Sequence, residues 1–322
     1  MSGRSLDEYG SPLFLAWQLT NRCEAHCLAC CEESGPDKAW LNELGRDESL
    51  RVADEAVALG IPYVAFGGGE PLGVPFCWDI FERLAASGVS IKLETNGRHI
   101  DDEAADRLVA LNVQCIQISV DGATAETHER ARPGSSFSAA MAAIDRLVAR
   151  GSAPQMVFSP TRANIHEIVP AYEMANRHGC SAFVTGPLMR LGRAALAWES
   201  LACEEAVWDD AAMALRAKAA ELGGGLMLSI YPWDIVTELE RRIESPQAML
   251  LVVPNGRVKL LNALPFSPAD LRRVSLAEAW EAYRRAWRTA EVRDFIARCR
   301  SEPDLLRHAN ETWYLRDAAW HR

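Results

Sequence analysis

The feature that most limits the fold of this chain is a repeated alternation of short apolar segments with longer segments of helical period. The short segments predict strands at residues 13–19, 62–66, 90–94, 113–119, 154–159 and 181–185. Strands separated in this way by helices form βαβ units. We therefore expect a parallel sheet over the first part of the chain.

Helices are expected between these strands, at residues 48–59, 75–87, 101–111, 136–150 and 165–178. Each of them ends near a glycine or asparagine, which are residues that commonly stop helices. Six strands and five helices are too few for a closed eight-stranded barrel. The sequence therefore predicts an α/β fold whose main part is an open, TIM-like partial (β/α)6 barrel.

The pattern changes after about residue 195. A long helix, a short strand, two further strands and a last helix are expected at residues 204–222, 226–231, 249–253, 257–261 and 275–300. The two middle strands flank Pro254-Asn255-Gly256, which is typical of a tight hairpin turn. We therefore divide the chain into a barrel at residues 1–195 and a smaller α+β region at residues 196–322, which would cap the substrate.

Composition limits the partners and the compartment. The net charge is −10, with acidic residues scattered along the chain, which argues against nucleic acid as a partner. No apolar run reaches the length of about 18 residues that a membrane span needs. Residues 1–12 lack the apolar core of a secretion signal. We therefore expect a cytoplasmic protein whose nine cysteines form no disulfide framework.

Four of the cysteines lie close together, directly after the first expected strand. Cys23, Cys27 and Cys30 have the spacing C-x3-C-x2-C, which lets one loop wrap three thiolates around an iron–sulfur cluster. Three ligands for four irons leave one iron free to bind another molecule. The alternative is zinc, with Cys31 or His26 as the fourth ligand, but structural zinc usually draws paired ligands from two segments. Ligands in parallel α/β folds gather where strands end, which favours the cluster.

A second motif extends this reading. Gly68-Gly69-Glu70-Pro71 follows the second expected strand. Together with the cysteine loop it resembles the radical S-adenosylmethionine (SAM) superfamily, in which the cysteines hold one [4Fe-4S] cluster. The resemblance implies that Gly68, Gly69 and Glu70 hold the methionine amino group of SAM. The family usually has an aromatic residue where this chain has Ala29.

The ends of the later strands resemble a branch of the same superfamily, whose members act on PQQ, heme and peptides and carry C-terminal SPASM or twitch domains. This resemblance covers residues 13–195. It implies further SAM-binding residues at Asn96, Ser119, Arg130, Ser159 and Leu188. Arg130 would suit the SAM carboxylate because a guanidinium donates two parallel hydrogen bonds.

The C-terminal region resembles a SPASM or twitch ending that has lost its ligands. Leu260, Leu261 and Asn262 stand where that ending carries a cysteine, and Cys299 is the only cysteine after residue 203. An auxiliary cluster normally needs three or four thiolates. We therefore expect a single [4Fe-4S] cluster and a degenerate C-terminal remnant.

The resemblance implies the chemistry. The cluster, reduced by an external donor such as flavodoxin or ferredoxin, cleaves SAM to methionine and a 5′-deoxyadenosyl radical that abstracts hydrogen from the substrate. With one cluster we expect a redox-neutral outcome such as epimerisation, elimination or decarboxylation. Because the barrel begins by residue 13, we expect no leader-binding domain. That favours a small polar natural-product intermediate, such as an amino sugar or nucleoside. Peptide modification and dehydrogenation are the alternatives.

Epimerisation would also need a hydrogen donor, and a thiol suits this role. The dispersed cysteines Cys180, Cys203 and Cys299 are the candidates, with Cys31 as a further one. Each of the dispersed cysteines also has a simpler explanation as a small buried apolar residue.

Overall fold

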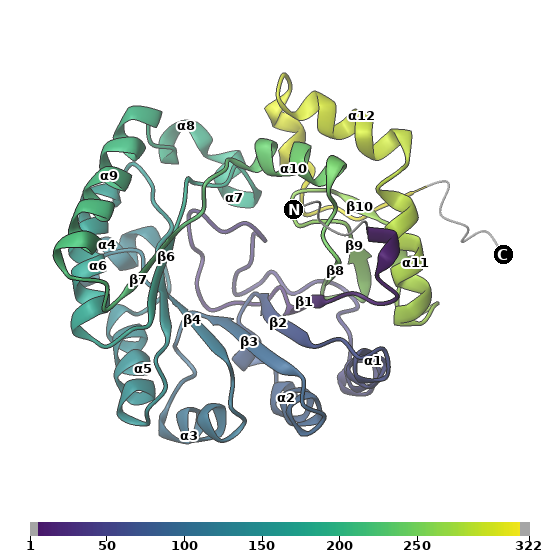
Figure 1. Cartoon of the computed structure of the whole chain (residues 1–322), viewed down its shortest axis with the longest axis horizontal. Helices are drawn as coiled ribbons and strands as arrows, with labels where there is room; N and C mark the ends of the chain where they lie inside the picture. Colours follow the sequence, from purple (N-terminus) through teal and green to yellow (C-terminus); the bar gives the residue numbers. More distant parts are fainter. Residues whose placement is uncertain (1–5, 316–322) are drawn as a thin grey trace.

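The central part of the molecule is a curved parallel sheet with helices on its outer side (Figure 1). This computed structural model describes residues 6–315. Six neighbouring parallel strands overlap the six that the sequence predicts: β1 (Phe14–Thr20), β2 (Tyr63–Gly68), β3 (Ser90–Thr95), β4 (Cys115–Ser119), β5 (Gln155–Val157) and β6 (Ala182–Thr185). The predicted α/β partial barrel is therefore confirmed.

The outer helices follow the strands in turn: α1 (Arg46–Ala58), α2 (Cys77–Ala86), α3 (Asp102–Ala110), α4 (Ala125–Ala131), α5 (Phe137–Ala149) and α6 (Ile168–Arg177). Helix α4 is too short to show a periodic pattern, and the sequence did not predict it. Its one local signal is Thr124, which caps the helix by accepting a hydrogen bond from the Thr127 amide. Among residues 6–315, no helix has both the length and the apolar character needed to cross a membrane.

The two faces of the strands differ in chemistry, and this difference creates the interior chamber. In β3, Ile91 and Leu93 are buried in the hydrophobic core, while Lys92 and Glu94 line the hollow inside the barrel. Successive side chains of a strand point to opposite faces, so one strand can build both surfaces. The core therefore lies between sheet and helices, and the barrel interior is left open to a ligand.

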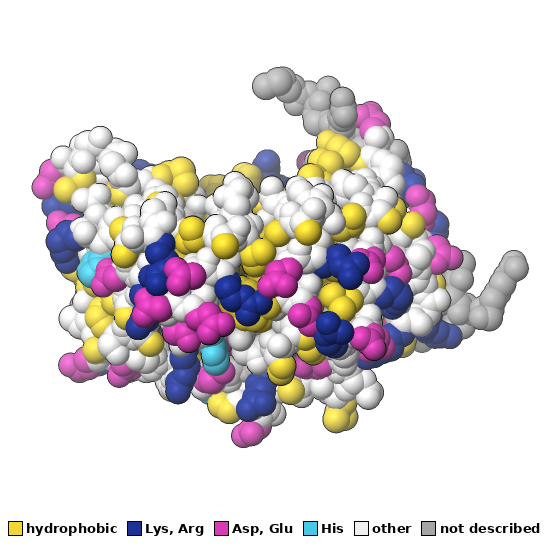
Figure 2. All heavy atoms as spheres, turned by 90° about the horizontal axis from the view of Figure 1, so that it is seen from below, with side chains coloured by type: hydrophobic (Ala, Val, Ile, Leu, Met, Phe, Trp, Pro, Cys, Tyr) yellow, Lys and Arg dark blue, Asp and Glu magenta, His cyan; other side chains and the backbone are white. Residues whose placement is uncertain are grey.

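Ion pairs join neighbouring helices on the outer face. Arg83 of α2 lies 2.7 Å from Asp54 of α1, and Arg107 of α3 lies 2.7 Å from Glu82 of α2. Figure 2 shows basic and acidic side chains interspersed over one face of the molecule. Exposed pairs of this kind each contribute little stability, so the apolar core must supply most of the cohesion.

The region after residue 195 continues the same sheet at both ends. Strand β7 (Met227–Ile230) pairs in parallel with β6, and β8 (Met249–Val252) pairs in parallel with β1. The predicted hairpin is present, because β9 (Arg257–Lys259) runs antiparallel to β8. Beyond β9 lies β11 (Ala269–Asp270). The boundary expected near residue 195 therefore does not separate two sheets.

Helices and a small second sheet complete this region. They are α7 (Gly192–Leu196), α8 (Trp198–Leu201), α9 (Glu205–Glu221), α10 (Ile235–Glu244), α11 (Leu276–Ala286), α12 (Ala290–Cys299), η4 (Pro303–His308), and the paired strands β10 (Phe266–Ser267) and β12 (Trp313–Tyr314). The single helix expected at residues 275–300 is wrong. Two helices form because Thr289 starts α12 as an N-cap, with its hydroxyl accepting from the Val292 amide.

A substitution in strand β8 tests whether the C-terminal region unfolds together with the barrel. Leu250 is fully buried, so Leu250→Ala should lower the free energy of unfolding by about 2–5 kcal/mol. We expect one unfolding transition, shifted to lower urea concentration, in tryptophan fluorescence. Leu41→Ala is the control, because that side chain is 90% exposed and should change stability by less than about 0.5 kcal/mol. Two separate transitions, with the barrel midpoint unchanged, would show that the regions unfold independently.

Candidate cluster and SAM site

The three predicted cluster cysteines lie in one loop that begins where β1 ends. Cys23, Cys27 and Cys30 all line the same chamber, and none is in a disulfide. Backbone hydrogen bonds fix the loop: the Cys23 amide donates to Gly35 and the His26 amide to Pro133. The structure therefore brings the three thiols to one wall, as the spacing predicts.

Burial keeps at least two of the three thiols protonated in the chain alone. Burial raises the pKa of Cys23 to about 12 and also raises the pKa of Cys30. These groups are therefore neutral thiols in the chain alone, and iron would favour their thiolate form. Among residues 6–315, no three Cys, His, Asp or Glu side chains are placed to share a single metal ion. A cluster of several irons accepts thiols set farther apart, so this donor set suits a cluster better than zinc.

A residue from the far end of the barrel clamps the cluster loop. Arg193, in α7, donates from Nε to the Cys27 carbonyl at 2.7 Å and from a terminal nitrogen to the Ser34 carbonyl at 2.6 Å. Its amide donates to the Cys30 carbonyl at 3.0 Å. Gly192 has φ +52°, and a Cβ there would lie 2.3 Å from the Cys31 carbonyl. Close backbone approach therefore requires glycine at this point.

The glycine motif after β2 lies against the cluster loop. The Gly69 amide donates to the Thr20 carbonyl at 2.7 Å, and a Cβ on Gly69 would lie 2.0 Å from the Arg22 carbonyl. Gly67, Gly68 and Gly69 line the chamber. They therefore form a wall whose backbone groups are accessible to a ligand.

Glu70 requires a correction, because its carboxylate does not line the chamber. Its side chain accepts hydrogen bonds from the Thr95 hydroxyl at 2.7 Å, the Asn96 amide at 2.9 Å and the Leu72 amide at 3.3 Å. Glu70 is 1% exposed. Burial raises its pKa, although these hydrogen bonds oppose the shift. The carboxylate therefore joins the segment after β2 to the end of β3 and does not line the chamber.

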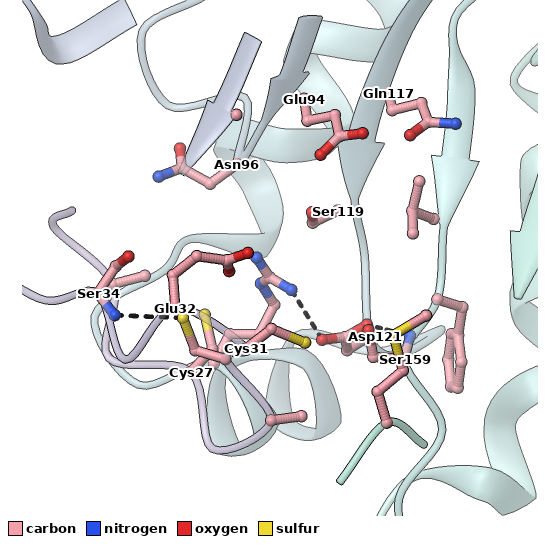
Figure 3. A pocket seen from close by; sticks show the side chains of 18 of the residues that line it. Cys27, Cys31, Glu32, Ser34, Glu94, Asn96, Gln117, Ser119, Asp121 and Ser159 are labelled. Carbon is pink, nitrogen blue, oxygen red and sulfur yellow. Dashed lines mark hydrogen bonds and ion pairs between the residues drawn. The ribbon is translucent and has the colours of Figure 1, made fainter. Parts of the chain in front are cut away.

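Four of the other predicted SAM-binding residues do line the chamber: Asn96, Ser119, Ser159 and Leu188. The Asn96 side-chain nitrogen is 3.8 Å from the Cys23 sulfur, which connects the end of β3 to the cluster loop. Figure 3 shows Asn96, Ser119 and Ser159 at the ends of neighbouring strands around the cysteines.

Arg130 is the exception, because its side chain is 52% exposed and pairs with Glu126 of α4 at 3.6 Å, outside the chamber. Arg132, two residues later, lines the chamber and donates to Asp121 Oδ2 at 2.9 Å. Asp121 Oδ1 accepts from the Ser159 amide at 2.7 Å, so this carboxylate ties β4 to β5 (Figure 3). The Nε of Arg132 is buried and has no hydrogen-bond partner. Arg132, which the sequence did not single out, therefore lines the chamber where Arg130 was expected.

The three dispersed cysteines predicted as hydrogen donors lie outside the chamber. Cys180 is buried just before β6, at the strand end opposite the site, and Cys203 lies between α8 and α9. Cys299 is buried in α12, where its thiol donates to the Phe295 carbonyl at 3.3 Å. None of these three lines the chamber, whereas Cys31 does. The structure therefore offers no support for Cys180, Cys203 or Cys299 as hydrogen donors.

A second hollow adjoins the chamber and shares part of its wall. The chamber has a volume of about 510 Å³, and the adjoining hollow, here called the inner lobe, about 370 Å³. Glu32, Glu94, Met189, Tyr231 and Asn262 line both. Burial, and then the nearby Glu94 carboxylate, raise the pKa of Glu32 to about 7. Sequence reasoning missed Glu32 and Glu94, although polar residues at alternate positions of β3 were a visible signal.

The clamp can be tested by following iron. Arg193→Ala removes two charge-assisted hydrogen bonds to the loop, so we expect iron to be lost to a chelator about tenfold faster. Iron absorbance would be followed under anaerobic conditions. Arg190→Ala is the matched control, because Arg190 pairs with Asp304 at 3.1 Å instead of the loop. Equal rates in both variants and the parent would contradict a role for Arg193 in holding the loop.

Comparison with known proteins agrees with this geometry. Residues 17–175 match a family model described as the radical SAM superfamily. The mycofactocin maturase MftC of Mycobacterium ulcerans is 35% identical over 192 residues, covering 59% of this chain and 51% of that protein. The AdoMet-dependent heme synthase of Methanosarcina barkeri is 32% identical over 185 residues, covering 57% and 52% respectively. This chain therefore spans about half the length of these relatives.

Solved structures show the same fold. The structure of Streptococcus suis SuiB bound to precursor peptide SuiA superposes with a TM-score of 0.70, at 12% identity, over 84% of this chain and 65% of that one. That likeness concerns the fold alone. Taken with the cysteine loop and the chamber around it, these matches show that residues 17–175 form a radical SAM domain, and domains of this family use a [4Fe-4S] cluster and SAM.

Proposed function

We propose that this chain cleaves SAM reductively and removes a hydrogen atom from a small polar substrate bound in the inner lobe. The observation that carries the proposal is the convergence of the cluster thiols, the glycine wall and the strand-end polar groups on one chamber that opens into a second. The bound cluster and SAM would supply a 5′-deoxyadenosyl radical, after one electron from a donor such as flavodoxin or ferredoxin. The protein's part is to bind, orient and exclude water.

The chain's own groups divide the binding of SAM between them. The backbone of Gly67–Gly69 and the side chain of Asn96 suit the methionine amino group, because they lie beside the cysteine loop. Arg132 takes the role expected of Arg130, since its unpartnered Nε can donate to the SAM carboxylate. Glu70 acts as a positioning residue that holds the amide of Asn96.

The inner lobe favours a small polar substrate, since Gln18, Lys92, Glu94 and Glu238 line it. We further propose a redox-neutral outcome, such as epimerisation, elimination or decarboxylation. The support is a resemblance, in which Leu260, Leu261 and Asn262 stand where a SPASM or twitch ending carries a cysteine. Peptide modification is the second candidate, because a maturase and a structure with a bound precursor peptide are among the similar proteins.

The experiment that tests the function uses the anaerobically reconstituted protein with dithionite and SAM. We expect 5′-deoxyadenosine and methionine in equal amounts, and about four iron and four sulfide per chain. Cys27→Ala should abolish both the iron and the cleavage. A fully loaded protein that leaves SAM intact would refute the proposal. About eight iron per chain would refute the single cluster and favour dehydrogenation.

A second prediction concerns the two arginines. Arg132→Lys keeps a positive charge beside Asp121 but loses the planar fork, so we expect SAM affinity to fall by about tenfold. Isothermal titration of SAM into the cluster-loaded protein measures this. Arg130→Ala is the matched control and should bind SAM like the parent, because Arg130 is outside the chamber. A loss of affinity in Arg130→Ala alone would reverse the assignment.

A further inference from the structure

The interior of this barrel has charged and amide side chains among its apolar ones, where a packed barrel would be apolar throughout. The interior of a closed barrel is normally filled by large branched side chains. Here Gln18 of β1, Lys92 and Glu94 of β3, and Gln117 of β4 face the chamber or the inner lobe. Figure 3 shows Glu94 and Gln117 projecting from neighbouring strands toward the space above the cluster loop. This surface suits a ligand with polar groups of its own.

Three carboxylates line the inner lobe. Glu32, from the segment after the cluster loop, and Glu94 lie on the wall shared with the SAM chamber. Glu238, from α10, is the third. Glu238 is 6% exposed, and its Oε2 is buried without a hydrogen-bond partner. A buried oxygen without a partner is costly, and a ligand that donates to it would remove that cost.

The cations that line the lobe are already paired. Lys92 lies 2.6 Å from Glu94, and the Nε of Arg242 donates to Glu238 Oε1 at 2.5 Å. Glu32 has only a long hydrogen bond from Gln18, at 3.4 Å, and no ion pair within the described residues 6–315. Among the side chains that line the lobe, the three carboxyl groups therefore outnumber the two basic groups.

Two other cations, Lys259 and Arg193, act electrostatically on Glu32, but both donate hydrogen bonds to backbone carbonyls. Lys259 donates to the carbonyls of Asn262 and Ala309, and Arg193 donates to carbonyls of the cluster loop. Neither Lys259 nor Arg193 forms an ion pair with Glu32 within the part of the chain that the structure describes. The charge of Glu32 is therefore free to interact with a ligand in the lobe.

We propose that the inner lobe binds a protonated amine of the substrate, with Glu32 and Glu94 as its acceptors and Glu238 Oε2 accepting from a second donor on the same molecule. This inference rests on the proposed function, because the amine would fix the substrate beside the SAM chamber. A neutral hydroxyl can donate to the same carboxylates, but it leaves the excess negative charge in the lobe uncompensated. An ammonium group satisfies both the hydrogen bonds and the charge.

Matched pairs of probes test the proposal on the cluster-loaded protein with SAM bound. The pairs are glucosamine against glucose and 1,5-diaminopentane against pentane-1,5-diol, measured by saturation-transfer NMR and equilibrium dialysis. We expect at least one amine to bind about tenfold or more tightly than its neutral partner. Equal affinities within both pairs, or no binding of either amine, would overturn the proposal.

Single substitutions locate the site. Glu32→Gln, Glu94→Gln and Glu238→Gln each remove one charge with little change of shape, and each should reduce the preference for the amine by about tenfold. Glu126→Gln is the control, because that side chain is 86% exposed on α4. Glu238→Gln is the most informative variant, because Glu238 is on α10, away from the cluster loop, and its substitution should leave the cluster undisturbed. An unchanged preference in all three variants would contradict the assignment.

The same samples separate this inference from the proposed function. SAM cleavage without substrate depends on the cluster and the SAM chamber, so it is measured beside probe binding. Intact SAM in the parent protein would refute the proposed function whatever the probes show. Normal SAM cleavage with no preference for amines would overturn this inference alone. Iron content equal to the parent shows that each variant has kept its cluster loop.

Discussion

The arrangement of this molecule depends on how a loop with almost no regular structure is held. The cluster loop is tied by hydrogen bonds to distant parts of the chain, above all by Arg193, which reaches three of its carbonyls. Arg193 lies after β6, so it reaches the loop only because the sheet curves round from β1 to β6. The thiols are therefore held in part by contacts between the segment after β6 and the loop after β1.

Two buried carboxylates fix the strand ends through hydrogen bonds to distant parts of the chain. Glu70 accepts a hydrogen bond from the Asn96 amide. Asp121 accepts one from the Ser159 amide and forms an ion pair with Arg132. A buried carboxylate is stable only when its oxygens are satisfied, and here backbone amides of the next strand satisfy them. These groups therefore fix the edge of the sheet on which SAM would lie. Because their oxygens are committed to the protein, both carboxylates hold the strand ends in place instead of binding a ligand.

The sequence was informative wherever structure is local. Strand positions, the cysteine loop and the glycine turn depend on neighbouring residues, and the structure reproduces them. The direction in which each side chain points could not be predicted from the sequence. Arg130 lies in the last turn of α4 and points outward, whereas the helix stops at Ala131 and the non-helical backbone of Arg132 turns that side chain toward Asp121. The sequence also did not predict the break before α12 or the contact of Arg193 with the cluster loop. The break depends on a single cap at Thr289, and the Arg193 contact depends on tertiary structure.

The C-terminal region explains why the cofactor is easier to infer than the substrate. Tyr231, Glu238, Arg242 and Asn262, all beyond residue 195, line the inner lobe. Asn310 also donates to the Cys31 carbonyl at 2.8 Å, so this region packs directly against the cluster loop. The matched domain ends at residue 175, before any of these groups. Most of the residues that line the chamber belong to the matched domain, including the cluster cysteines and the glycines after β2. The inner lobe takes a larger share of its wall from residues after 175, so the side chains there bear most on which molecule would fit.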